Sequence, residues 1–196
     1  MIKKIFTIFT LLFLISNTIQ ASENNILNIG NSEAKITIKV FSSLTCPHCA
    51  NFHNKIFIKL KKEYIDTKKV KLEHHGFPLD LAALNAEKIL RSVTDNEKSF
   101  QLLTIIYEKQ NEWAVGSDID KINNSLKKIA INFGLSTLAI DKFINDEKIQ
   151  DQILNERINA QKNYNISSTP TIYINEKKYE GKHEFKSFKK SLDKLL

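Results

Sequence analysis

Hydrophobic and polar residues follow two different periods in the first part of this chain. Residues 35–41 (KITIKVF) alternate polar and apolar positions before ending in large apolar ones, which predicts a central β-strand. From Pro47 onward the apolar residues recur every four positions and would line one face of a helix; they are Phe52, Ile56, Leu60 and Tyr64. Proline is tolerated in a first helical turn, because its missing donor would be unpaired there anyway.

The remaining pattern predicts two more strand regions separated by a long helical segment. A second strand is expected over residues 69–75, followed by a turn at residues 76–80. Residues 81–164 show only helical periodicity and predict an insertion of about four helices, with Gly134 ending one helix and Ser136 capping the next. Strands at 171–174 and 178–180 and a last amphipathic helix over 185–195 complete the order. This is an α/β pattern in one domain.

Residues 1–21 have the layout of a signal peptide. Lys3 and Lys4 precede an uncharged stretch at residues 5–19, and the small residue Ala21 follows it. We expect cleavage after Ala21 and export of residues 22–196, with retention of the segment as a membrane anchor as the alternative. The apolar stretch is short for a membrane span, which takes about 20 residues.

The basic charge of the chain gives little information about partners. The formal net charge is +7, and it falls to +5 without residues 1–21, which carry two lysines and no acidic residue. Lysines are spread along the whole sequence, and no arginine-rich patch or interleaved aromatic motif is present. We therefore interpret the charge as solvated surface and expect no nucleic-acid partner.

The two cysteines, Cys46 and Cys49, enclose Pro47 and His48 in a four-residue motif. One closely spaced pair provides no disulfide framework for the fold, and an exported protein can use it for redox chemistry. A cysteine just before a helix lies near free N–H groups and the positive end of the helix dipole, which favours its thiolate. We expect Cys46 to be the attacking sulfur, protonated His48 to favour its thiolate further, and Cys49, one helical turn on, to be the resolving sulfur.

A C-x-x-C motif has other uses that must be compared with this one. Haem attachment requires histidine directly after the second cysteine, and Ala50 stands there. Structural zinc needs four ligands, and the chain has no second cysteine pair. A copper or zinc site made of Cys46, Cys49 and His53, with His74 or His75 as a distant fourth ligand, remains an alternative. Our prediction is that the protein has no metal and no other cofactor.

A second motif, Ser168-Thr169-Pro170-Thr171, places a proline at the start of a strand, where its missing N–H costs no ladder hydrogen bond. From the residues alone, the Thr169–Pro170 bond can be cis or trans.

Together these motifs resemble the DsbA-type branch of the thioredoxin-fold oxidoreductases over nearly all of residues 22–196. The segments that carry the resemblance are residues 43–49 (SLTCPHC), 77–80 (FPLD), 110–114 (QNEWA), 168–171 (STPT) and 179–181 (YEG).

The resemblance implies a thioredoxin fold, a central mixed sheet flanked by helices, with a helical insertion at about 81–164 between the second and third core strands. It also implies that Pro170 is cis and faces the cysteines, that Thr169 binds substrate through its backbone, and that the insertion caps the site. Pro47 and His48 between the cysteines are typical of oxidising members. One departure is Val40, where such proteins often carry a buried glutamate that handles protons; Glu73 is a candidate replacement.

The implied function is that of a monomeric periplasmic protein thiol:disulfide oxidoreductase, a dithiol oxidase that passes the Cys46–Cys49 disulfide to exported proteins with free cysteines. A DsbB-like membrane protein linked to quinone would reoxidise it. Two alternatives remain open: a disulfide isomerase or reductase, and a periplasmic copper or zinc chaperone.

Overall fold

The computed structural model describes residues 26–196, so the expected signal peptide lies outside the described residues. In this range five strands form one mixed sheet in the order β1-β3-β2-β4-β5. Strand β2 pairs in parallel with β3 and antiparallel with β4, and the two edge strands pair antiparallel with their neighbours. The strands are β1 (Leu27–Gly30), β2 (Ile36–Ser42), β3 (Val70–Gly76), β4 (Thr171–Ile174) and β5 (Lys177–Lys178).

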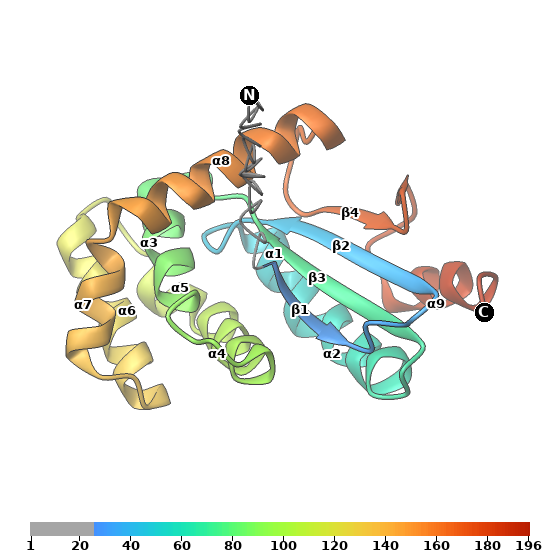
Figure 1. The fold of residues 1–196 in the computed structure, drawn as a ribbon, viewed down its shortest axis with the longest axis horizontal. Helices are drawn as coiled ribbons and strands as arrows, with labels where there is room; N and C mark the ends of the chain where they lie inside the picture. Colours follow the sequence, from blue (N-terminus) through green and yellow to red (C-terminus); the bar gives the residue numbers. More distant parts are fainter. Residues whose placement is uncertain (1–25) are drawn as a thin grey trace, which may run out of the picture.

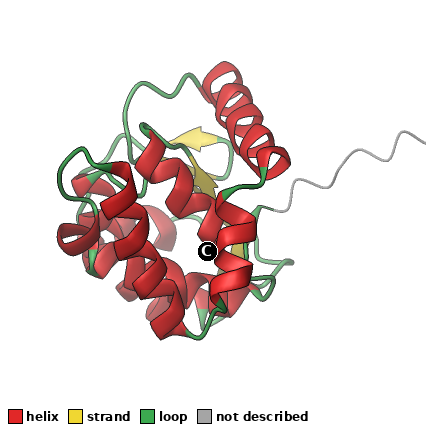
Figure 2. Cartoon of the chain, turned by 90° about the vertical axis from the view of Figure 1, so that its left-hand side faces the viewer, coloured by secondary structure: helices red, strands yellow, loops and turns green. Residues whose placement is uncertain are grey.

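Helices flank this sheet and also form a separate group beside it. Figure 1 shows α3 to α7 gathered to one side of the sheet, and Figure 2, viewed from that side, shows mainly helices with strands behind them. None of the helices described in residues 26–196 is long and apolar enough to cross a membrane. The helices are α1 (Pro47–Phe52), η1 (His53–Phe57), α2 (Ile58–Leu60), η2 (Lys61–Ile65), α3 (Leu81–Leu90), α4 (Asn96–Glu108), α5 (Gln110–Trp113), α6 (Ile119–Phe133), α7 (Thr137–Ile144), α8 (Glu147–Tyr164) and α9 (Phe185–Asp193).

The helix that begins at Pro47 runs to Ile65 and contains two π-helical segments, η1 and η2. On a regular α-helix, residues four apart drift around the axis by roughly 40° per step, because one turn holds 3.6 residues. Wider π turns reduce this drift. They explain how apolar residues spaced by four all reach the core, where each is at most 4% exposed: Phe52, Ile56, Leu60 and Tyr64.

The two faces of the sheet pack against different helices. Ile38 and Val40 of β2 belong to the main core, together with side chains of α1, α4 and α9. Phe41, on the opposite face, packs with Ala160 of α8 and with Ile166 in a smaller cluster. The alternation of side chains along β2 therefore places a helical layer on each face of the sheet.

The expected fold class is confirmed, and the order of the predicted strands along the chain and the position of the helical insertion match the sequence prediction. Gly134 ends α6 with φ +107°, and the Ser136 side chain caps α7 by accepting a hydrogen bond from the Ala139 N–H, as expected.

The expected number of helices in the insertion was wrong, because residues 81–164 contain six helical segments rather than about four. The pattern missed α3, because residues 82–90 of this helix are all buried, polar ones included, so it has no exposed face to produce an amphipathic period. It also missed α5, which has only four residues. Strand β1, likewise four residues long, was missed for the same reason.

Asp80 links the insertion to the loop that follows β2. Its carboxylate caps α3 by accepting a hydrogen bond from the Ala83 N–H at 2.7 Å, and it also accepts one from the Thr45 hydroxyl at 2.7 Å. Asp80→Ala should lower the free energy of unfolding in urea by about 1 kcal/mol for the lost cap, with up to about 1 kcal/mol more for the bond to Thr45.

Asp95→Ala is the matched control, because Asp95 caps α4 through the Lys98 N–H and has no equivalent of the Thr45 bond among the described contacts. If the two variants lose the same stability, the Thr45–Asp80 bond contributes nothing.

Candidate active site

Cys46 lies at the N-cap of α1, directly after the loop that leaves β2. Its backbone is extended (φ −78°, ψ 119°), and Pro47 occupies the first helical turn. The carbonyl of Cys46 accepts hydrogen bonds from the N–H groups of Cys49 and Ala50, both at 3.1 Å. The helix therefore starts at the motif, as the sequence predicted, and its first N–H groups are directed towards the Cys46 side.

The Thr169–Pro170 segment, just before β4, lies next to Cys46 in the loop that follows β2. The β2–β4 register places Phe41 opposite Thr171, so the residues just before β4 lie beside those just after β2. In its thiol form, Cys46 donates a hydrogen bond to the Thr169 carbonyl at 3.3 Å, and the Thr169–Pro170 peptide bond is cis. The expectation of a cis Pro170 next to the cysteine pair is confirmed.

The two sulfurs have opposite acidities. A hydrogen bond from the Cys49 thiol lowers the pKa of Cys46 to about 5, although burial acts against it; Thr169 and the backbone N–H groups of Cys49 and His48 add smaller contributions in the same direction. Burial first, and then the hydrogen bond and negative charge of Cys46, raise the pKa of Cys49 far above its usual range. Cys46 is therefore a thiolate at neutral pH, while Cys49 stays a thiol.

The four residues of the motif differ in solvent exposure. Pro47 and His48 are exposed, Cys46 is 8% exposed and Cys49 is 1% exposed. Both cysteines are free, so the structure describes the dithiol form. His48 contributes its backbone N–H to the Cys46 thiolate, and its ring lies close enough to His183 to lower the pKa of that residue, after the larger effect of burial.

The insertion holds the active-site loop through a residue that the sequence analysis did not single out. Gln110 of α5 is 5% exposed and donates its side-chain amide to the carbonyls of Leu44 and Cys46, at 2.7 and 3.1 Å. Gln110 lies in one of the segments that resemble the DsbA branch, which was the available signal. Its role could not be assigned because nothing in the pattern places α5 against this loop.

The suggestion that Glu73 replaces the missing acid at Val40 was wrong. Glu73 is bound by Lys71 at 2.9 Å and His75 at 3.1 Å on β3. Side chains alternate along this strand, and it is Leu72 and His74 that line the space beneath Cys49. Glu73 therefore points to the opposite face of the sheet.

The metal-site alternative receives no support from the described residues. His53 donates or accepts a hydrogen bond with the Thr104 hydroxyl at 2.8 Å, and its ring stacks on Phe57 at 4.3 Å. Among residues 26–196 there is no group of three or more His, Cys, Asp or Glu side chains placed to hold a metal ion.

The acidity of Cys46 predicts how the reduced protein responds to pH. The rate of alkylation of Cys46 by iodoacetamide should be nearly constant around neutral pH and should fall below about pH 5, the pKa of the thiolate. Unfolding releases this thiol to its ordinary pKa of about 8.5. Between these values the unfolded state binds more protons, so the contribution of Cys46 to stability should grow as the pH rises from about 5 towards 9, and it is lost as the pH falls through the folded pKa.

Cys46→Ala is the control for both measurements, because the remaining Cys49 should not react in this range. A labelling midpoint near the ordinary thiol value of about 8.5 would contradict the stabilised thiolate.

Comparison with known proteins places this site in a family. The model of the thioredoxin family matches residues 22–194. The crystal structure of alpha-DsbA1 from Wolbachia pipientis superposes with a TM-score of 0.82 at 31% identity, over 87% of this chain and 90% of that one. BdbD from Bacillus subtilis, in its oxidised form, shares the fold with a TM-score of 0.73 at 23% identity, over 87% of this chain and 92% of that one.

Relatives identified by sequence agree with these structures. Disulfide bond formation protein D of Bacillus subtilis is 28% identical over 177 residues, which are 86% of this chain and 76% of that protein. A relative in Rickettsia bellii, named as a candidate protein-disulfide oxidoreductase, is 26% identical over 91% of this chain and 67% of its own length. The chain spans 61–67% of the length of the rickettsial relatives. The chain belongs to the thioredoxin family and, within it, to the DsbA-like protein-disulfide oxidoreductases.

Proposed function

We propose that this protein is a dithiol oxidase that donates the Cys46–Cys49 disulfide to exported proteins. The observation that carries the proposal is the stabilised thiolate of Cys46, whose pKa is about 5. A disulfide is a strong oxidant when its reduced form is unusually stable, and ionisation of Cys46 stabilises the reduced form. This reasoning also explains the oxidising power of DsbA.

In the proposed reaction, a substrate thiolate attacks the Cys46 sulfur of the oxidised protein. The Cys46–Cys49 bond breaks, its electron pair leaves on Cys49, and a mixed disulfide joins Cys46 to the substrate. A second substrate thiolate then attacks the substrate sulfur, so that the substrate leaves oxidised and Cys46 leaves as a thiolate. Cys46 is the better leaving group of the two cysteines, because its pKa is the lower one.

The segment around Pro170 is the proposed substrate-binding surface. The Cys46 sulfur lies 3.3 Å from the Thr169 carbonyl oxygen. A substrate strand that brings its cysteine to Cys46 would lie next to this backbone and could pair with it, as an extended peptide pairs with a free strand edge.

The cellular setting is part of the proposal. Residues 1–21 would direct export to the periplasm, where disulfides persist. The protein would act as a monomer on exported proteins with free cysteines, and a DsbB-like quinone-linked membrane oxidase would regenerate its disulfide. The isomerase or reductase alternative requires the Cys46–Cys49 pair to be kept reduced in the cell.

Cys49→Ala should trap substrates. The variant retains the Cys46 sulfur but cannot release a bound partner by forming the internal disulfide, so mixed disulfides with exported proteins should accumulate on non-reducing gels. Cys46→Ala is the matched control and should trap none. A Cys49→Ala variant that traps nothing, alongside an active wild type, would show that Cys46 is not the substrate-facing sulfur.

The reduction potential distinguishes an oxidase from a reductase. Equilibration with glutathione should give a value nearer to that of DsbA, about −120 mV, than to that of thioredoxin, about −270 mV. His48→Ala should make the potential more negative by up to about 30 mV and raise the Cys46 pKa by up to about one unit, because a protonated ring can then no longer favour the thiolate while the backbone N–H remains.

Lys55→Ala is the control for His48→Ala, since it removes one exposed positive charge from η1, away from the helix start. The pKa and the potential of the His48 variant must move together. A wild-type potential near that of thioredoxin would contradict the oxidase and favour the reductase.

A further inference from the structure

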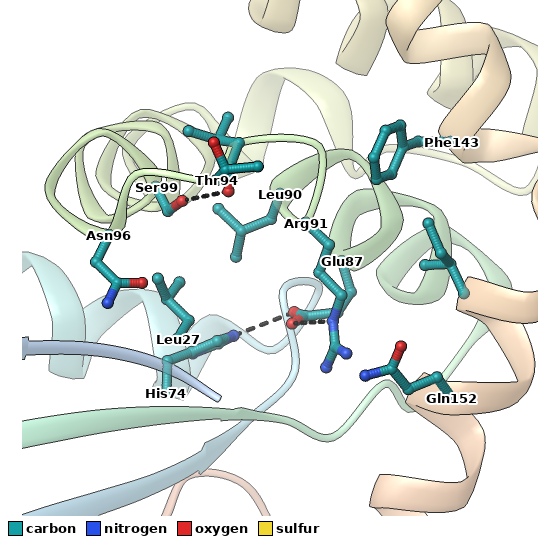
Figure 3. Close-up of a pocket in the computed structure, with 12 residues that line it drawn as sticks. Leu27, His74, Glu87, Leu90, Arg91, Thr94, Asn96, Ser99, Phe143 and Gln152 are labelled. Carbon is teal, nitrogen blue, oxygen red and sulfur yellow. Dashed lines mark hydrogen bonds and ion pairs between the residues drawn. The ribbon is translucent and has the colours of Figure 1, made fainter. Parts of the chain in front are cut away.

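A hydrogen-bonded chain of buried polar residues lies beneath the active site. The Nε2 of His74 is 3.1 Å from a carboxylate oxygen of Glu87, and its Nδ1 is 3.3 Å from the hydroxyl of Ser42. All three residues are at most 5% exposed. Figure 3 shows the imidazole of His74 pointing from its strand towards Glu87, with Arg91 on the far side of the carboxylate.

This chain borders the resolving cysteine. Cys49, Ser42 and His74 line the same cavity of about 10 Å³, on the order of the space for one water molecule. In the sheet, His74 is the register partner of Val40, which also lines this cavity. The imidazole therefore stands next to the position where the sequence lacks the expected acid.

His74 also lines a second pocket, on the side of the imidazole away from Cys49. Together with Glu87 it lines a pocket of about 140 Å³ whose rim includes the exposed residues Thr94 and Asn96. A proton on His74 can therefore be exchanged with solvent through this pocket, whereas Cys49 is 1% exposed.

Glu87 is the anionic partner of His74 in this cluster. Burial would raise the pKa of Glu87, but His74 and Arg91 outweigh burial and lower it, so Glu87 is an anion. A carboxylate can only accept, so in the neutral imidazole the Nε2–H donates to Glu87 and Nδ1 is free to accept from Ser42.

The other titratable groups that face His74 are poor bases. Burial, together with the charge of His74, lowers the pKa of His53 to about 3, and burial raises the pKa of Tyr107 well above its usual value. Both are therefore neutral at physiological pH. Among the described residues, the ionisable groups that line a cavity with His74 or bond to its partners include Cys49 of α1, His53 of η1, Glu87 and Arg91 of α3, Tyr107 of α4, Glu156 and Tyr164 of α8, and His75 of β3.

We propose that His74 is the proton-relay residue for Cys49: it takes the Cys49 proton through Ser42 when Cys49 attacks, and returns it when Cys49 leaves. Glu87 orients the imidazole and stabilises its protonated form, as a carboxylate does for a histidine base. The inference rests on the proposed function, because it assigns a residue to one step of that exchange.

The step can be written for a mixed disulfide between Cys46 and glutathione. The Cys49 sulfur forms a bond to the Cys46 sulfur, the bond between Cys46 and glutathione breaks, and its electron pair leaves on the glutathione thiolate. The Cys49 proton passes across the cavity to the Ser42 hydroxyl, which gives its own proton to Nδ1 of His74. His74 then loses its Nε2 or Nδ1 proton to solvent.

His74→Gln tests the relay. Reduced protein is mixed with excess oxidised glutathione, quenched in acid at set times and analysed by mass spectrometry, which separates formation of the mixed disulfide at Cys46 from its resolution by Cys49. Resolution should slow by about 10²-fold at neutral pH, while formation is unchanged. The difference in the rate of resolution between the variant and the wild type should become smaller as the pH rises, because hydroxide then takes the place of the missing base.

Ser42→Ala is the second variant, since it removes one buried hydroxyl and leaves the His74–Glu87 pair in place. It should slow resolution without slowing formation, and it carries the test if His74→Gln does not fold. The matched controls are His75→Gln and Glu73→Gln, whose side chains pair on the opposite face of β3 and should leave both rates unchanged.

Resolution at the wild-type rate in the folded variants, or equal slowing of both steps, would overturn the relay. If wild-type protein forms no mixed disulfide with glutathione, the proposed function fails instead, so the two failures are distinguishable.

Discussion

The antiparallel pairing of β2 with β4 is the constraint on which the active site depends. β2 ends at Ser42 and β4 begins at Thr171, and the register that pairs Phe41 with Thr171 brings the Cys46 loop to the Thr169–Pro170 segment. At the far end of the pair, the Thr37 N–H donates to the Asn175 side chain at 2.8 Å and the Asn175 N–H donates to the Thr37 carbonyl at 2.7 Å. A slip of one residue would turn every side chain of β4 to the opposite face, so burial of the sheet also fixes the geometry of the site.

The different acidities of the two cysteines follow from their positions on one short helix. Cys46 stands at the N-cap, where the backbone N–H groups of His48 and Cys49 can hydrogen-bond its sulfur. Cys49 lies one turn further along, buried under the sheet, where desolvation opposes a charge. The negative charge therefore remains on the sulfur that meets other proteins, and the inner sulfur needs a separate route for its proton.

The sequence predicted those parts of the fold and site in which chemistry or burial leaves a local pattern. Strand β2 and the helix after it show clear periods because one face of each is buried, and the Cys46–Cys49 motif is contiguous. Helix α3 gave no period because nine of its ten residues are buried. The contacts of Gln110 with the active-site loop could not be predicted, because they depend on which loop α5 packs against in the folded protein. The sequence prediction named Glu73 and did not consider His74 for this role, although the alternation of Val70 and Leu72 with Lys71 already places Glu73 on the polar face of β3.

The energetics of the His74–Glu87 pair also point away from a purely structural role. Burying a histidine next to a carboxylate costs desolvation that their interaction barely recovers, and replacing such a buried pair with apolar residues is often neutral or stabilising. Stability alone therefore gives weak reason to place a histidine and a carboxylate, each at most 5% exposed, under the active site. Arg91 binds both Glu87 and Glu156 and so joins the pair to α8, which secures the position of the carboxylate. A carboxylate held in this way can keep an imidazole aligned with Ser42 while the charge on the ring changes, which is the property that a proton relay requires.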